Sequence, residues 1–97
     1  MLTTIGADAD AGTLARTLVE ERLAACVNVL APMSSTYRWK GQVAVDREQQ
    51  LVMKTRPDRV AALEARLKAL HLYELPEFIV LSAAAGAAYA AWLDEST

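Results

Sequence analysis

Four residues form the set that could bind a metal ion: Cys26, His71, Glu74 and Glu77. A thiolate and an imidazole suit copper and zinc. However, the sequence has no C-x-x-C or H-E-x-x-H motif and only one histidine. Pro76 also argues against the helix that would place His71 and Glu74 on one face. Two structural explanations therefore stay open beside the metal site: a buried small cysteine at a strand start, and a histidine that interacts with a helix C-terminus.

Catalytic patterns are missing from the chain. Cys26 and His71 would form a nucleophilic dyad, but neither lies in a known signature. No serine lies in a G-x-S-x-G turn, and no glycine-rich loop for phosphate is present. The sequence therefore predicts a protein that is not an enzyme.

Most aromatic residues lie outside the predicted aliphatic core. Five of the six fall in predicted loops, hairpin tips or the terminal helix: Tyr37, Trp39, Tyr73, Tyr89 and Trp92. Tyrosine and tryptophan suit ligand clefts and interfaces, because one end is apolar and the other forms hydrogen bonds. The alternative, packing beneath loops, has equal weight.

Composition limits the class of protein. The 97 residues, with a net charge of −2, indicate one folded domain (residues 1–97) and argue against a general nucleic-acid binder. The single cysteine cannot form an internal disulfide, no secretory signal is visible, and no apolar run approaches the ~20 residues of a membrane span. Nineteen alanines make the expected core light, which favours self-association.

The hydrophobic patterns predict an α+β fold. Two amphipathic helices are expected, over residues 11–25 and from a capping box at Thr55 and Asp58 to Leu70. Arg22 falls inside the apolar arc of the first helix, and either snorkelling to water or a buried ion pair would explain it. The strands and the last helix are expected at residues 2–5, in a hairpin with arms 27–39 and 42–55, at 78–81 and at 86–93.

This order is β-α-β-β-α-β with a C-terminal helix. It predicts the ferredoxin-like arrangement: an antiparallel sheet with both main helices on one face. The other face then lacks helices and needs a cover, which again suggests an oligomer.

Five motifs in register resemble the CutA divalent-cation tolerance family. They are E-E-R-L-A-A-C-V-N at residues 20–28, Y-x-W-K-G at 37–41, K-T-R at 54–56, H-x-Y-E-x-P-E at 71–77 and Y-x-x-W at 89–92. The match runs from Thr3 to Trp92. Leu72 departs from the family pattern, which usually has proline there, and Arg38 replaces a common aromatic residue.

The resemblance implies a cytoplasmic, non-enzymatic homotrimer that binds a divalent metal, copper above all, and contributes to the response to metal ions. The alternative is a sensor like the PII signalling proteins, which would bind a small polar ligand between protomers. Neither role involves nucleic acid or a membrane. The carried-over metal ligands are His71, Glu74 and Cys26, and the other cleft residues are Tyr37, Trp39, Lys54, Tyr73 and Trp92.

Overall fold

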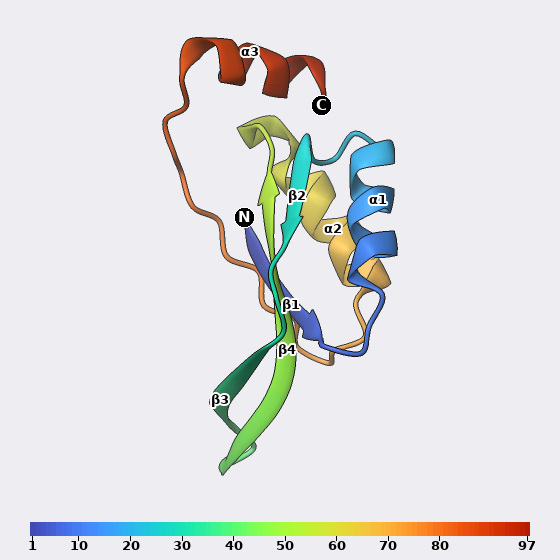
Figure 1. Cartoon of the computed structure of the whole chain (residues 1–97), viewed down its shortest axis with the longest axis vertical. Helices are drawn as coiled ribbons and strands as arrows, with labels where there is room; N and C mark the ends of the chain where they lie inside the picture. The colour runs from blue at the N-terminus through green and yellow to red at the C-terminus, as the bar shows by residue number, and fades with distance from the viewer.

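A single antiparallel sheet is organised around one long strand, β4 (Gln42–Lys54), in the computed structural model, which describes residues 1–97. The C-terminal half of β4 pairs with β1 (Leu2–Gly6) and β2 (Cys26–Val29). Its N-terminal half pairs with β3 (Met33–Trp39), and these two strands form a hairpin that extends well beyond the helices (Figure 1). Lys40 and Gly41 turn the hairpin with φ values of 50° and 78°, a conformation that glycine adopts without strain.

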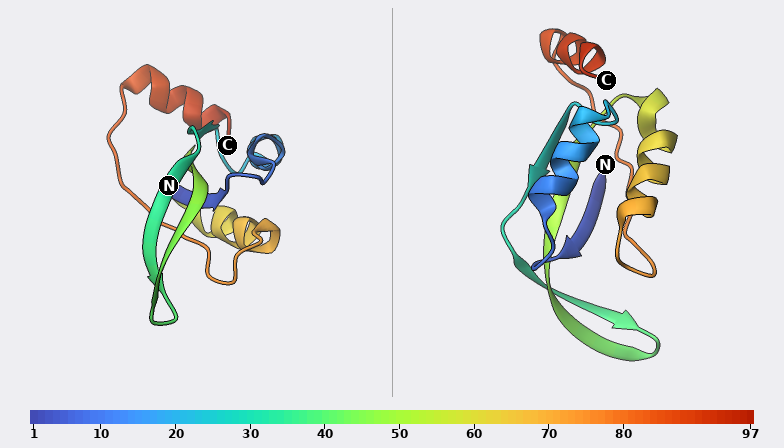
Figure 2. Two further views of the ribbon diagram at one scale, coloured as in Figure 1. Left: turned by 60° about the horizontal axis from the view of Figure 1, so that its bottom comes forward. Right: turned by 90° about the vertical axis from the view of Figure 1, so that its right-hand side faces the viewer.

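Two helices cover one face of the sheet, as the ferredoxin-like prediction requires. They are α1 (Ala11–Glu20) and α2 (Val60–Leu70), which follows a 3₁₀ turn at Pro57–Arg59 (Figure 2). Asp10 caps α1, because its carboxylate accepts a hydrogen bond of 3.0 Å from the Thr13 amide. The last helix, α3 (Ala87–Glu95), lies beyond the end of the sheet (Figure 1). The α+β fold is confirmed.

Strand alternation divides β4 between a core face and a helix-free face. Leu51 and Met53 point to the core, where Met53 packs with Leu18 and Leu63. Only 13 of the 97 residues are buried, and many large apolar side chains are exposed. Such a light core fits a chain that buries more surface by association. No helix is long and apolar enough to span a bilayer.

The expected first helix is too long. The observed helix α1 ends at Glu20 and not at residue 25, and Arg22 lies beyond it in the left-handed conformation with φ 60°. The Leu23 amide bonds the Leu18 carbonyl and the Arg22 amide bonds the Val19 carbonyl, both at 3.0 Å, which is a Schellman motif. Arg22 therefore lies outside the helix, and its guanidinium donates to the Glu95 carbonyl oxygen at 3.2 Å.

Two further expectations need correction. Thr55 and Asp58 form no capping box, because the Thr55 hydroxyl donates instead to the Leu23 carbonyl oxygen at 2.8 Å. The expected strand at 78–81 is reduced to one bridge, between Leu2 and Ile79. Two backbone hydrogen bonds of 2.8 and 3.0 Å join this pair, which places the segment beside β1 without extending the ladder.

Candidate functional site

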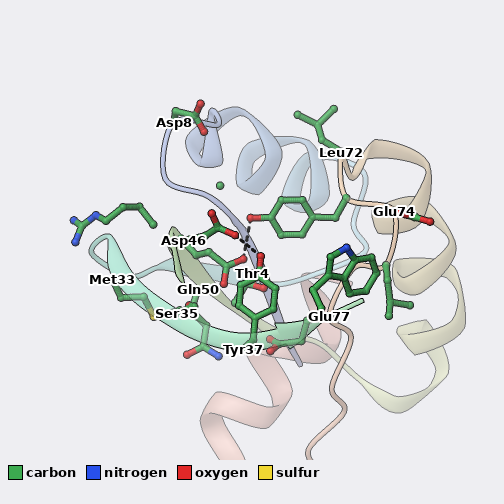
Figure 3. Close-up of a pocket in the computed structure, with 16 residues that line it drawn as sticks. Thr4, Asp8, Met33, Ser35, Tyr37, Asp46, Gln50, Leu72, Glu74 and Glu77 are labelled. Carbon is green, nitrogen blue, oxygen red and sulfur yellow. Dashed lines mark hydrogen bonds between the residues drawn. The ribbon is translucent and has the colours of Figure 1, made fainter. Parts of the chain in front are cut away.

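A pocket of about 850 Å³ lies on the helix-free side of the sheet (Figure 3). Its walls come from β1, the loop between β1 and α1, β3, β4 and the segment that joins α2 to α3. The lining includes three aromatic residues and several carboxylates: Tyr37, Trp39, Tyr73, Asp8, Asp46, Glu48, Glu74 and Glu77.

Strand register brings the hairpin residues to one wall. Ser35 lies opposite Asp46 and Met33 lies opposite Glu48, so their side chains share a face. The Tyr37 hydroxyl donates to the Asp46 carboxylate, two residues along the same face (Figure 3). This hydrogen bond is the main cause that raises the pKa of Tyr37. The hydroxyl of Tyr37 is therefore directed at Asp46.

A second tyrosine–carboxylate pair lies deeper in the pocket. The Tyr73 hydroxyl donates to Glu48 Oε2 at 2.8 Å, and Glu48 is only 8% exposed. Burial, and then this bond to Glu48, raise the pKa of Tyr73 far above its usual value. The pair joins the α2–α3 segment to β4 across the pocket.

The pocket has a strong excess of negative groups. Asp8, Asp46, Glu48, Glu74 and Glu77 line it, whereas Arg47 is its only cationic lining residue. Glu77 Oε2 is buried and accepts no hydrogen bond. The arrangement favours a ligand that carries positive charge.

His71 positions the pocket wall. Its Nε2 lies 2.8 Å from the Thr4 carbonyl oxygen, and its Nδ1 accepts a hydrogen bond of 3.1 Å from the Tyr73 amide. The carbonyl requires a proton on Nε2 and the amide requires a lone pair on Nδ1, so the ring is the neutral Nε2–H tautomer. The rings of His71 and Tyr73 have centroids 4.9 Å apart. Both ring nitrogens are thus used inside the chain.

The structure separates the predicted site residues into two sets. Tyr37, Trp39, Tyr73 and Glu74 line the pocket, with Glu74 at the edge far from Asp46 (Figure 3) and 3.7 Å from the Lys40 ammonium. The remaining four are absent from its lining: Cys26, Lys54, His71 and Trp92.

These four residues have other surroundings. Cys26 lies opposite Lys54 in the β2–β4 ladder, and its thiol is 3.9 Å from the Asn28 side-chain oxygen. Trp92 contacts Tyr89 on α3, with ring centroids 5.3 Å apart. No three histidine, cysteine, aspartate or glutamate side chains of one chain come close enough to hold a metal ion. One chain by itself therefore does not form a metal centre from His71, Glu74 and Cys26.

Sequence reasoning missed Asp46 and Glu48 as site residues and did not place Glu77 in a pocket. The signal for the first two lay in the predicted hairpin, where two-residue alternation places them on the Tyr37 face. Glu77 reaches the pocket only because the segment after α2 returns beside β1.

Comparison with known proteins decides the family. The family described as CutA1 divalent ion tolerance protein matches residues 1–96. The chain belongs to the CutA1 family. This confirms the resemblance that the five motifs predicted.

Relatives agree over the whole chain. A divalent-cation tolerance protein CutA of Thermus thermophilus is 45% identical over 98 residues, covering 100% of this chain and 95% of that protein. A solved CutA1 structure from Thermus thermophilus has a TM-score of 0.92 at 45% identity, covering 99% of this chain and 94% of the other. A PII-like protein CutA from Nostoc has a TM-score of 0.91 at 37% identity, covering 99% and 93%.

Plant relatives are longer. The rice protein CutA 1, chloroplastic, is 42% identical over 87% of this chain, and the match covers 48% of that protein.

The family name describes tolerance of divalent ions rather than a reaction. The family is therefore one of tolerance proteins with a PII-like fold.

Proposed function

We propose that this chain is a non-enzymatic, cytoplasmic homotrimer that binds a divalent cation, copper above all, and contributes to divalent-cation tolerance. The observation that carries the proposal is the acidic pocket, whose lining includes five carboxylates and only one cationic side chain. Such a cavity attracts and concentrates positive ions. Family membership supports the tolerance role.

Trimer formation is part of the proposal because the protruding hairpin and the rim of the pocket expose large apolar side chains to water. Val43 and Val45 are about two-thirds exposed at 65% and 64% on the protruding hairpin, and Leu72 is 88% exposed beside the pocket. Isolated soluble domains rarely leave this much large apolar surface uncovered. Copies of the same chain are the proposed cover.

The proposed metal donors are His71, Glu74 and Cys26, and in this proposal they act between copies. Within one chain they do not converge. His71 must give up one of its two hydrogen bonds to coordinate an ion. Copper binding through His71 therefore predicts loosening of the Tyr73 wall.

Isothermal titration with Cu(II) tests this set. Cys26→Ser and Glu74→Gln each remove one donor, and Asp94→Asn removes an exposed carboxylate on α3 as the matched control. The proposal predicts weaker Cu(II) binding in the first two variants and unchanged binding in the third. Equal binding in all four proteins would remove these residues from the metal site.

A second candidate function is a PII-like sensor that binds a small molecule. The observation that favours it is the pocket volume of about 850 Å³, since pockets for small organic ligands occupy about 300–1,000 Å³. Thermal unfolding against a metabolite panel tests it, because a ligand at 100 times its Kd adds about 2.7 kcal/mol to stability. A panel without any stabilising compound would count against this candidate.

A further inference from the structure

The carboxylates of the pocket are spread around its wall instead of converging on one point. Asp8 and Asp46 lie on one side, and Glu74 lies on the opposite side (Figure 3). Because no three acidic, histidine or cysteine side chains of one chain come within reach of a single ion, the pocket of one chain does not by itself coordinate a bare metal ion. Separate positive groups, some distance apart, would match it better.

Two carboxylates of the pocket have buried or nearly buried oxygens and no charged hydrogen-bond donor, which is energetically unfavourable. Glu77 Oε2 is buried without a donor, and the nearly buried Glu48 has a neutral tyrosine hydroxyl as its hydrogen-bond donor. A buried carboxylate oxygen without a partner is unfavourable, and an N⁺–H donor would satisfy it strongly. Glu48 and Glu77 therefore lack cationic donors within the chain.

Aromatic and aliphatic side chains form the rest of the wall. Tyr37, Trp39 and Tyr73 line it, with Leu72 and Leu75 beside the acidic groups. Hydrogen bonds to Asp46 and Glu48 hold the two tyrosines. Aromatic rings attract ammonium groups, and Trp39 already has the Lys40 ammonium 5.7 Å from its ring centroid. This wall suits an apolar chain between charged ends.

We propose that this pocket binds a linear aliphatic polyamine, with one ammonium group at Asp46 and Glu48, another toward Glu74 and Glu77, and the methylene chain against the aromatic wall. The proposal rests on the small-molecule candidate above and names its ligand class. Three observations carry it together: the cavity, the separation of its carboxylates, and its aromatic lining.

Calorimetric titration of the full chain with spermidine tests the proposal, with butylamine and Mg²⁺ as comparison probes. Spermidine should bind at least about tenfold more tightly than butylamine, which has one charge, and than Mg²⁺, which has no apolar chain. Glu77→Gln should weaken spermidine binding about tenfold, and Asp94→Asn should leave it unchanged.

The aromatic contribution has its own pair of variants. Trp39→Ala should weaken spermidine binding, and Trp39→Phe should recover most of the loss because it keeps a ring. Thermal melts of each variant show that it is folded. Absence of spermidine binding, or equal affinity for spermidine and Mg²⁺, would overturn the proposal.

These outcomes are separate from the metal proposal. Absence of spermidine binding by the wild-type chain, with Cu(II) binding intact, would refute the polyamine inference alone. Retained spermidine binding in Cys26→Ser, together with lost Cu(II) binding, would support both. If Glu77→Gln and Trp39→Ala leave spermidine affinity unchanged, the ligand does not occupy this pocket and the inference fails.

Discussion

Removal of the Tyr73 hydroxyl should destabilise the chain more than removal of the Tyr37 hydroxyl. Both hydroxyls donate to a carboxylate in the same pocket. They differ in the acceptor, because Glu48 is 8% exposed and Asp46 is exposed. Water can replace the donor at Asp46, whereas Tyr73→Phe leaves Glu48 with an unsatisfied, nearly buried oxygen.

The expected magnitude follows from this burial. A hydrogen bond to a charged group contributes about 1.5–3 kcal/mol, and exposure of part of the Tyr73 ring reduces the expected loss to about 1–2 kcal/mol. For a domain of this size, each kcal/mol corresponds to about 4–8 °C in melting temperature. We therefore expect Tyr73→Phe to melt at least about 4 °C below wild type.

Thermal unfolding followed by circular dichroism, at one fixed protein concentration, measures the difference. Fixed concentration matters because association changes the apparent stability. Tyr37→Phe is the matched control and should have the same melting temperature as wild type. Equal losses in the two variants, or no loss in Tyr73→Phe, would refute the argument from burial of Glu48.

Three further predictions follow from single contacts. The pKa of Tyr73 is raised in the folded chain, so unfolded chains lose this proton first; the stability difference between wild type and Tyr73→Phe should be constant from pH 7 to 9 and shrink above about pH 10, as urea unfolding at each pH will show. Leu63→Ala should cost about 2–5 kcal/mol in the same assay because Leu63 is fully buried, and Lys68→Ala on the exposed side of α2 should cost far less. Gly41→Ala should lower the melting temperature, because φ is 78° at Gly41, whereas Gly86→Ala meets open space at a negative φ and serves as the control.

Local patterns predicted the fold where one periodicity dominated. The end of the amphipathic run at Leu70 and the hairpin turn at Gly41 were both placed correctly, whereas residues 30–32 divide the expected arm 27–39 into β2 and β3. The order of these elements then predicted a sheet with one bare face, because few other arrangements bury the apolar sides of both helices against the same sheet. Local rules and tertiary packing agree in these segments.

The errors occurred where a distant partner decides the structure. Arg22 adopts a conformation that usually indicates glycine, so no local signal indicated that the first helix ends before it. Thr55 satisfies the standard capping pattern but bonds the Leu23 carbonyl instead. The apolar run at Phe78 matched a central strand, yet it makes a single bridge to β1. Pairing between distant segments cannot be deduced from either segment alone.

The candidate site was predicted in part for the same reason. Tyr37, Trp39, Tyr73 and Glu74 were named from the family motifs, and all four line the pocket. Asp46 and Glu48 belong to no motif. The pairing register of β3 with β4 places them on the face of Tyr37, and Tyr73 reaches Glu48 from the segment after α2. His71 was a candidate ligand by residue type, but its two hydrogen bonds are visible only in three dimensions.

Multi-angle light scattering at micromolar concentration tests whether copies of this chain cover the exposed apolar hairpin and enclose the acidic pocket. The account predicts a particle of three times the 10.5 kDa chain mass. Val45→Lys, which places a charge on the exposed hairpin, should reduce that mass, and Asp94→Asn should not. A wild-type particle of 10.5 kDa would contradict the account.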